Sequence, residues 1–352
     1  MSGGVDSSVA ALLLKNKGYD VVGAFMKGWF WSGPDASVGV NCAEEDARDA
    51  RRVAGVLGIP FYVFDFESEF KKEVVDYMIG EYAVGRTPNP DVMCNREIKF
   101  GLFLKKTLAL GADYIATGHY VQLKRNNPNF KRSSANGIFS VLMAKDKNKD
   151  QSYFLWTLTQ KQLKHCLFPI GNYTKHHIRA IAGKYNLPTA EKPDSQGVCF
   201  VGEIDVAGFL KEKLGKNPGP ILTLAGKKIG IHDGLSFYTI GQRRGIGSTG
   251  GGVPYYVVSK DERKNALIVA EAENPALFSK ELTIKDINWI SWKQPKLPLQ
   301  CLARIRYRQP LQKATINKYS IVFDEPQRAV TPGQSAVFYI KTGEMLGGGI
   351  IE

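Results

Sequence analysis

Residues 2–8 read Ser2-Gly3-Gly4-Val5-Asp6-Ser7-Ser8 and lead directly into an apolar helical run at residues 9–14. Two glycines let a backbone approach an anion closely, and the amides of the turn and of the helix N-terminus can then cradle a phosphate. The stretch lacks the Gly-Lys-Ser/Thr ending of a Walker A loop, so it predicts a different kind of phosphate loop. The alternative interpretation is a glycine-rich turn with a serine at the helix N-cap.

From this loop to about residue 193, short β-type runs alternate with helical patterns. Residues 21–26, 61–66 and 114–117 are predicted strands, and the last of them stops at Gly118-His119. Apolar residues recur at helical spacing between residues 43 and 57. Alternation of this kind predicts an α/β fold with a parallel sheet and crossover helices.

The pattern changes after about residue 193, where Gly- and Pro-rich turns separate short β-type runs. From about residue 280 onward all the runs are of the β type, which predicts a small β domain and then a β-barrel or sandwich. We therefore expect three domains, at residues 1–193, 194–275 and 276–352.

Composition and charge limit the class of protein. The chain has 352 residues, 43% of them hydrophobic and 23% charged, which excludes a disordered, collagenous or small disulfide-rich protein. No apolar run approaches the ~20 residues that span a bilayer, and the first residues do not resemble a signal peptide. We therefore expect a cytoplasmic protein without membrane contact. The net charge of +13 favours a polyanionic partner such as nucleic acid over a merely solvated basic surface.

The five cysteines form neither a CxxC pair nor a zinc spacing, so we expect no metal site. Cys42, Cys166 and Cys301 are interpreted as buried structural residues. Cys94 differs, because it follows the stiff turn Asn89-Pro90-Asp91 and precedes Asn95, a good N-cap for a helix that starts near Arg96. The positive end of that helix would favour the thiolate.

Asp91 is a candidate acid or base, although an anion beside Cys94 disfavours the thiolate. Cys199 lies in a polar, glycine-containing loop at residues 194–200. Either cysteine alone is more often structural. Together, beside a phosphate loop, they suggest sulfur chemistry in which one cysteine carries a persulfide and the other resolves it as a disulfide.

Near the C-terminus, Arg304, Arg306 and Arg308 alternate with apolar or aromatic residues and would share one face of a strand. Three guanidinium groups in a row suit phosphates, and Tyr307 could stack on a base. A solvated barrel face is the alternative.

The phosphate loop resembles the PP-loop of ATP pyrophosphatases, and the whole chain resembles bacterial tRNA-specific 2-thiouridylases. The motifs that carry this resemblance lie along nearly the full length, at residues 2–8, 85–91, 94–95, 116–120, 149–155, 197–200, 239–243 and 331–339. The resemblance implies adenylation of the C2 oxygen of the wobble uridine, position 34 of tRNA. ATP would be split to AMP and pyrophosphate, and sulfur would then replace the oxygen.

The resemblance also implies site residues. ATP, with Mg²⁺, would bind Met1, Ser2, Gly3, Gly4, Val5, Asp6, Ser7, Met26 and Gly118, although Met26 could equally be plain core. A strand normally precedes such a loop and none does here, so we expect a start assigned too late rather than a rearranged sheet. Asn89, Pro90 and Asp91 would face the target base. Cys199 would carry the persulfide and form a disulfide with the nucleophile Cys94.

For tRNA binding the resemblance implies contacts from His119, Lys149, Asp150, Gln151, Arg306, Tyr307 and Gln334. His119 could instead be a polar residue that is satisfied at the end of its strand. A persulfide-donating relay protein or a cysteine desulfurase would supply the sulfur. Two other functions stay open: an ammonia-using PP-loop ligase or amidotransferase, which needs no cysteine pair, and a non-catalytic RNA-binding protein.

Overall fold

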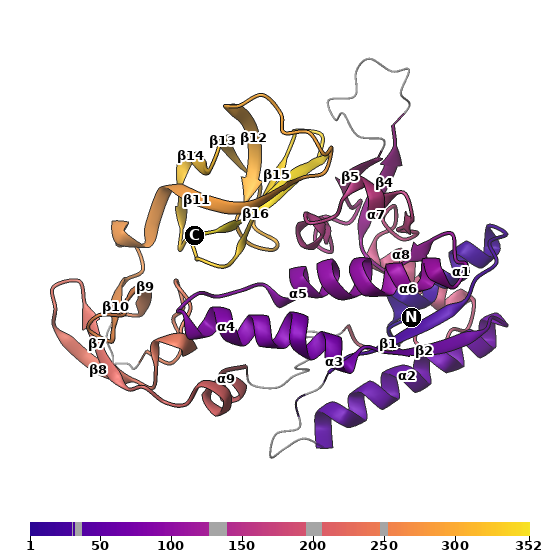
Figure 1. Ribbon diagram of the computed structural model, residues 1–352, viewed down its shortest axis with the longest axis horizontal. Coiled ribbons are helices and arrows are strands. Elements are labelled where there is room, and N and C mark those ends of the chain that lie inside the picture. The colour runs from indigo at the N-terminus through magenta and orange to yellow at the C-terminus, as the bar shows by residue number, and fades with distance from the viewer. Residues whose placement is uncertain (30, 32–36, 127–138, 195–205, 247–252) are drawn as a thin grey trace.

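The computed structural model describes the chain apart from residues 30, 32–36, 127–138, 195–205 and 247–252, and apart from the side chains of residues 37–42 and 207. Three parts follow one another along the chain: an N-terminal α/β part, a small β-sheet and a closed β-barrel (Figure 1). The α/β class and the C-terminal barrel that the sequence predicts are confirmed. Among the described residues, no helix combines the length and hydropathy of a membrane span.

The N-terminal part is built around helix α1 (Val5–Asn16), which starts at the phosphate loop and buries Val9, Ala10 and Leu12. Strand β1 (Gly23–Lys27) pairs in parallel with β2 (Phe61–Asp65), and α2 (Ser37–Leu57) connects them. Strand β3 (Ile115–Ala116) pairs in parallel with β6 (Cys166–Leu167). The predicted parallel pairing is therefore present, in two separate two-stranded sheets rather than in one continuous sheet.

Two long helical stretches cross this part, and each contains a wide π-helical segment. The first runs through α3 (Glu67–Phe70), η1 (Lys71–Asp76) and α4 (Tyr77–Ala83). The second runs through α5 (Pro90–Met93), η2 (Cys94–Phe103) and α6 (Leu104–Ala109). The expected helix start near Arg96 is wrong: Asn89 is the N-cap, its side-chain oxygen accepts the Val92 N–H at 3.2 Å, and Pro90 is the first helical residue. Proline is favoured there because its fixed φ is already helical.

The N-terminal part has five further elements among the described residues. They are the hairpin β4 (Val121–Arg125) and β5 (Phe139–Met143), then η3 (Ser152–Leu155), α7 (Gln160–Leu163) and α8 (Lys175–Lys184). Thr159 and Gln162 form a capping box at the start of α7, and the Thr174 side chain caps α8. Both helix starts follow the sequence rule that a threonine N-cap accepts an early helical N–H.

The middle of the chain starts with α9 (Val206–Leu214) and forms a four-stranded sheet in the order β8-β7-β10-β9. Its strands are β7 (Gly219–Thr223), β8 (Lys228–His232), β9 (Tyr255–Asp261) and β10 (Ala266–Glu271), with η4 (Leu235–Phe237) between β8 and β9. Its core contains Ile221, Val257, Leu267 and Val269.

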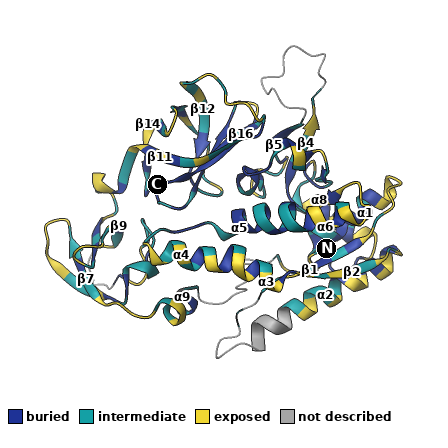
Figure 2. Ribbon diagram, in the orientation of Figure 1, coloured by how far each residue is buried: buried dark blue, intermediate teal, exposed yellow. Residues whose placement is uncertain are grey.

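A short η5 (Pro275–Leu277) leads into the six-stranded barrel, whose order is β11-β14-β13-β12-β15-β16. The strands are β11 (Phe278–Trp289), β12 (Leu299–Arg304), β13 (Gln312–Ile316), β14 (Ser320–Arg328), β15 (Ser335–Tyr339) and β16 (Met345–Ile351). Strand β16 is buried at every position except Leu346 and appears mostly dark blue in Figure 2. One face of it contacts the barrel core, and the other faces the N-terminal part, where Gly348 leaves room for the Trp156 ring.

The expected face of three arginines is wrong. Strand β12 ends at Arg304, and the chain then turns, with Arg308 at a left-handed φ of 63°. Arg304 is only 3% exposed and forms an ion pair with Asp150, which is 1% exposed, at 2.6 Å. Because the strand ends at Arg304, the period-2 alternation that would place Arg306 and Arg308 on the same face stops there.

Candidate active site

The phosphate loop is shaped by close backbone contacts. Gly3 has a φ of 75°, and a Cβ there would lie 2.4 Å from the carbonyl oxygen of Asp46. The Ser7 hydroxyl accepts the Ser2 N–H at 3.0 Å and lies 3.2 Å from the Ser2 hydroxyl. Gly4 is the N-cap of α1, so no side chain occupies the first N–H groups of that helix. Those groups are donors of the kind that bind a phosphate.

Segment 117–120 packs directly against this loop. A Cβ at Gly118 would lie 2.7 Å from the backbone nitrogen of Ser7, so only glycine fits without a shift of the loop. The Tyr120 hydroxyl donates to the Asp6 carboxylate at 2.7 Å. Gly118 thus lies against the phosphate loop, and its role in ATP binding stays a prediction.

Met1 and Met26, also predicted to bind ATP, are both associated with strand β1. Met1 places its amino group on the carbonyl oxygen of Ala24, and burial lowers the pKa of that amino group to about 5. Met26 lies in β1 and is half-buried against the largest hydrophobic cluster. Its position suits both the adenine-flanking and the core interpretation.

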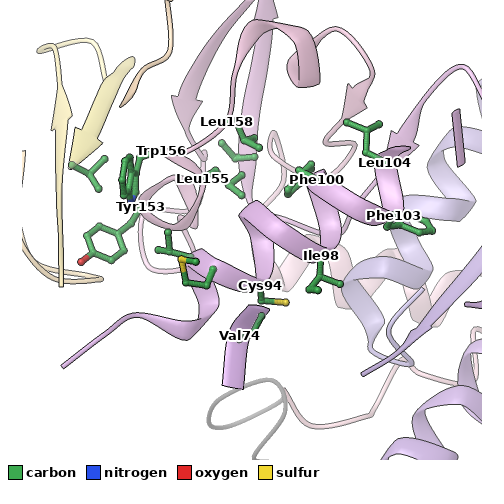
Figure 3. Close-up of a cluster of buried hydrophobic side chains, with 14 of the residues drawn as sticks. Val74, Cys94, Ile98, Phe100, Phe103, Leu104, Tyr153, Leu155, Trp156 and Leu158 are labelled. Carbon is green, nitrogen blue, oxygen red and sulfur yellow. The ribbon is translucent and has the colours of Figure 1, made fainter. Parts of the chain in front are cut away.

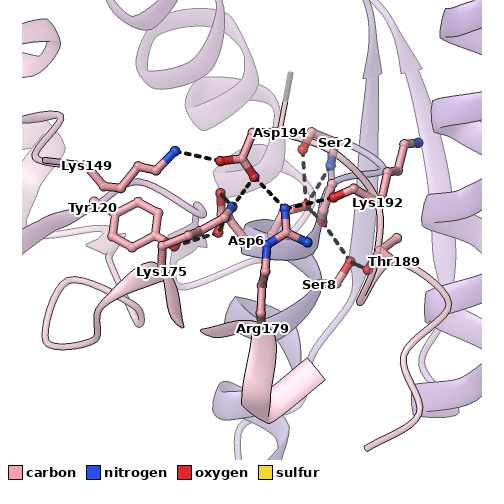
Figure 4. A network of polar contacts seen from close by, with 12 residues as sticks. Ser2, Asp6, Ser8, Tyr120, Lys149, Lys175, Arg179, Thr189, Lys192 and Asp194 are labelled. Atoms are coloured by element: carbon pink, nitrogen blue, oxygen red, sulfur yellow. Dashed lines mark hydrogen bonds and ion pairs between the residues drawn. The ribbon is translucent and has the colours of Figure 1, made fainter. Parts of the chain in front are cut away.

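A network of charges surrounds Asp6 (Figure 4). The Lys175 ammonium, from the first turn of α8, lies 2.9 and 2.8 Å from the two oxygens of Asp6 and 2.7 Å from an oxygen of Asp194. Lys149 and Arg179 also bind Asp194, at 2.5 and 2.9 Å. Burial alone would raise the pKa of Asp194, but hydrogen bonds from Lys149 and Lys175 outweigh it and lower the pKa to about 2.

The turn that leads to Asp91 and Cys94 is held by both β domains. Gln334 of the barrel donates to the carbonyl oxygens of Thr87 and Pro88, at 2.9 and 3.1 Å, and the Thr87 N–H donates to the Pro332 carbonyl oxygen at 2.9 Å. From the central sheet, the Lys260 ammonium donates to the Gly85 carbonyl oxygen at 2.7 Å. These contacts fix the backbone just before Asn89.

Cys94 and Asp91 lie one helical turn apart, on the same face of the helix. Cys94 is 4% exposed and lies in the largest hydrophobic cluster beside Val74 (Figure 3). Because the helix starts at Pro90, Cys94 is a full turn inside it rather than at its N-terminus. Burial raises the pKa of Asp91, and the nearby Lys99 offsets part of that rise. Asp91 is therefore suited to accept and release a proton.

Of the other four cysteines, the structure describes the side chains of Cys166 and Cys301. Cys199 lies outside the described residues, and so does the side chain of Cys42. Burial raises the pKa of the Cys166 and Cys301 thiols to about 12, which keeps both protonated and unreactive. Cys166 is buried as expected, whereas Cys301 is only half-buried.

Each residue expected to contact tRNA contacts another residue of this chain. His119 is 8% exposed, its Nδ1 lies 2.8 Å from the Thr117 hydroxyl, and burial lowers its pKa well below the usual value. Gln151 accepts the Tyr120 N–H at 2.9 Å. The Arg306 guanidinium donates to the carbonyl oxygen of Ala329, and the Tyr307 ring lies 4.6 Å from that of Phe154.

For Asp150 a direct contact with RNA does not fit its surroundings. Its carboxylate accepts hydrogen bonds from Arg304, from the Ser152 hydroxyl at 2.9 Å and from the Ala144 N–H at 2.9 Å. The sequence reasoning missed Arg304 as its partner, and also missed Lys175 and Arg179 beside the loop. Two cations four residues apart after a threonine N-cap would have indicated one basic helix face.

Comparisons with known protein families cover the chain in three consecutive parts. Residues 1–203 match the tRNA methyl transferase HUP domain, residues 207–271 the tRNA methyl transferase PRC-barrel domain, and residues 279–351 the aminomethyltransferase beta-barrel domain. With the phosphate loop and its charge network, these matches define a nucleotide-binding HUP-domain protein of the tRNA-modifying class.

Curated relatives narrow the class. A tRNA-specific 2-thiouridylase MnmA 2 of Geobacillus kaustophilus is 49% identical, over 100% of this chain and 93% of the relative. The tRNA-specific 2-thiouridylase MnmA of Streptococcus agalactiae is 48% identical, over 100% and 94%. The chain belongs to the tRNA-specific 2-thiouridylase family. Among solved structures, a protein described as a predicted subunit of tRNA methyltransferase from Methanocaldococcus jannaschii is 18% identical and covers 61% of this chain and 84% of its own. Its TM-score is 0.29, which is too low to support an argument about the fold.

Proposed function

We propose that the protein is a tRNA-uridine 2-sulfurtransferase that thiolates the wobble uridine, position 34 of tRNA, in the cytoplasm. The observation that carries this proposal is that the phosphate loop and the Asp91–Cys94 helix belong to one domain of a chain 48–49% identical to 2-thiouridylases over its full length. The net charge of +13 supports a polyanionic substrate.

The first step would activate the uridine. A urea-like carbonyl oxygen is a poor leaving group, so the C2 oxygen attacks the α-phosphate of ATP and pyrophosphate leaves. Residues 1–7 with Gly118 would hold the phosphates, and Met26 would flank the adenine. The N-terminal amides of α1 would then face the place where negative charge develops on the pyrophosphate, which would lower the barrier.

The second step would bring the sulfur. Asn89, Pro90 and Asp91 would face the base, and the outer sulfur of a Cys199 persulfide would attack C2 and displace AMP. The Cys94 thiolate would then attack the inner sulfur of Cys199, so that the electron pair of the broken S–S bond goes to the sulfur on C2. Asp91, with its raised pKa, would take the proton of the Cys94 thiol. The products are 2-thiouridine and a Cys94–Cys199 disulfide.

Other parts of the proposal concern partners. Mg²⁺ is usually held by one or two carboxylates and the substrate phosphates. Asp6 would hold the ion once the Lys175 ammonium, which now binds both of its oxygens, leaves one of them, and the ion would neutralise phosphate charge. A persulfide-donating relay protein or a cysteine desulfurase would load Cys199. Lys149, Gln151, His119, Arg306, Tyr307 and Gln334 would contribute to the tRNA-binding surface, directly or through the backbone that they hold. The domains would span residues 1–193, 194–275 and 276–352.

A single turnover on unmodified tRNA tests this function. Without reductant, wild-type protein with a loaded persulfide should yield AMP, pyrophosphate and 2-thiouridine. A Cys94–Cys199 cross-linked peptide should appear in proportion to the product. Cys94→Ser should stop product formation, and Cys199→Ser should also stop persulfide loading. Cys301→Ser is the matched control and should behave as wild type, because that thiol is held protonated in the barrel.

Three results would contradict the proposal. Formation of ADP and phosphate would exclude adenylation. Product formation with both thiols still free would exclude the disulfide step. Full activity of Cys199→Ser would favour the ammonia-using ligase, which needs no cysteine pair.

A further inference from the structure

The phosphate loop contains no basic residue of its own. Its charged side chain is the acidic Asp6, and the hydroxyls of Ser2 and Ser7 are neutral. Release of pyrophosphate leaves several negative charges in this place, and enzymes that transfer nucleotidyl or phosphoryl groups usually put lysine, arginine or a metal ion against them. A cation from elsewhere in the chain is therefore needed beside the loop.

Helix α8 supplies such a cation. The Lys175 side chain is 13% exposed, and its ammonium binds both oxygens of Asp6 at 2.9 and 2.8 Å. Because Asp6 lies in the first turn of α1, this ammonium stands at the same helix end as the phosphate-binding amides. Arg179, four residues further along α8, faces the same side and reaches Asp194 at 2.9 Å.

Asp194 has the surroundings of a bound anion. Lys149, from the turn before η3, and Lys175 and Arg179, both from α8, all point at this one carboxylate, at 2.5, 2.7 and 2.9 Å (Figure 4). Asp6 and Asp194 carry two negative charges against the three positive charges of these cations, so one positive charge is in excess. A phosphate group carries more charge than a carboxylate and offers three acceptor oxygens. The cluster is thus better matched to a phosphate than to the side chain it now holds.

We propose that Lys175 and Arg179 bind the β- and γ-phosphates of ATP and hold the pyrophosphate that leaves, and that Asp194 occupies this anion site until the nucleotide enters. This inference rests on the proposed function, since it names further residues of the same ATP site. In the free protein the ammonium of Lys175 is used by Asp6 and Asp194. Phosphate oxygens replace Asp194 on Lys175 and Arg179, and Lys149 keeps its contact with the displaced carboxylate.

The two partners of this exchange give opposite expected effects. Lys175→Met removes one charge-assisted hydrogen bond and should weaken binding of inorganic pyrophosphate about 10- to 100-fold. Asp194→Asn removes the negative charge that competes with pyrophosphate and keeps a side chain of nearly the same size. It should tighten pyrophosphate binding about 3- to 10-fold. A merely structural role of the cluster predicts weaker binding for both.

The experiment is calorimetric titration of the full-length chain with inorganic pyrophosphate, followed by steady-state assays with ATP and tRNA. Lys175→Arg keeps a cation and should recover part of the affinity. Lys184→Met is the matched control, because Lys184 is an exposed lysine in the last turn of the same helix. In the steady-state assay Lys175→Met should raise the KM for ATP and leave tRNA affinity unchanged.

The outcomes separate this inference from the proposed function. Weaker binding for Asp194→Asn, or an unchanged affinity for Lys175→Met, would overturn the exchange. Thermal unfolding checks that each variant is folded. If Lys175→Met does not fold, the pyrophosphate affinity of Lys175→Arg tests the inference in its place. If wild-type protein makes no 2-thiouridine, the proposed function fails, but the pyrophosphate titrations still decide whether the anion site exists.

Discussion

The buried pair of Asp150 and Arg304 joins the N-terminal part to the barrel, and its removal gives the sharpest test of how the two are connected. Asp150→Asn keeps the oxygen that accepts the Ala144 N–H but puts an amide against the guanidinium of Arg304. Arg304 is 3% exposed, and its Nε already has no hydrogen-bond partner among the described residues. An uncompensated buried cation is the result.

The expected cost follows from this burial. Removal of one partner of a buried ion pair typically destabilises a protein by about 3–5 kcal/mol, because the other charge stays buried and unpaired. We expect a loss of about 3 kcal/mol for Asp150→Asn and a similar loss for Arg304→Gln. In the double variant the glutamine oxygen can accept from the asparagine amide. The double variant should therefore lose at least about 2 kcal/mol less than the sum of the single losses.

Urea unfolding of the four proteins, followed by circular dichroism and by tryptophan fluorescence, measures these energies, since Trp156 lies at the contact with the barrel. Binding of tRNA by filter assay gives the second readout. If Asp150 acts only through Arg304, the double variant recovers tRNA affinity together with stability. Recovered stability with lost tRNA affinity would refute the reasoning and restore Asp150 as a direct contact.

Three further predictions concern the active site. Gly118→Ala puts a Cβ 2.7 Å from the Ser7 nitrogen and should lower the rate of adenylation about 100-fold, measured as pyrophosphate release, with tRNA binding unchanged. In wild type the single-turnover rate should fall at low pH as Asp91 becomes protonated, and this fall should occur at a higher pH than for an ordinary carboxyl group, because burial raises the pKa of Asp91. Asp91→Asn should remove this pH dependence. Burial lowers the pKa of Lys260 to about 8, so between pH 8 and about 10.5 the unfolded state binds more protons and folding is favoured as pH rises. The stability of wild type relative to Lys260→Met, from urea unfolding, should therefore increase over that interval and stay constant below it.

Local patterns explain why much of the fold could be predicted. The phosphate loop, the helix that follows it and the β-type runs of the barrel are each encoded within about ten residues, so the sequence predicts them without knowledge of the partners. The predicted start near Arg96 is too late, because two asparagines, Asn89 and Asn95, compete as N-cap of the helix that contains Cys94. Asn89 is preferred because Pro90 follows it directly and can be the first helical residue, whereas no proline directly follows Asn95.

Contacts between distant residues could not be predicted in the same way. Lys175 and Asp6 are 169 positions apart, and Asp150 and Arg304 are 154 apart. Alternation near Arg304 favoured an exposed basic face, but the single buried carboxylate of Asp150 outweighs that pattern, because an arginine beside it gains an ion pair in a low dielectric. Such pairings depend on how whole domains pack, which no window of sequence contains.

The same packing explains why the β domains matter for chemistry at a site in the N-terminal part. The turn before Asn89 receives Gln334 and Pro332 from the barrel and Lys260 from the central sheet. A Cβ at Gly333 would lie 2.8 Å from the Thr87 carbonyl oxygen, so the barrel fits this turn closely. An error of 1 Å in the placement of a reacting group can cost about 100-fold in rate. If tRNA binds the barrel as proposed, its binding would therefore reach Asp91 and Cys94 through the backbone of residues 85–89, in addition to any direct contact between the RNA and Gln334.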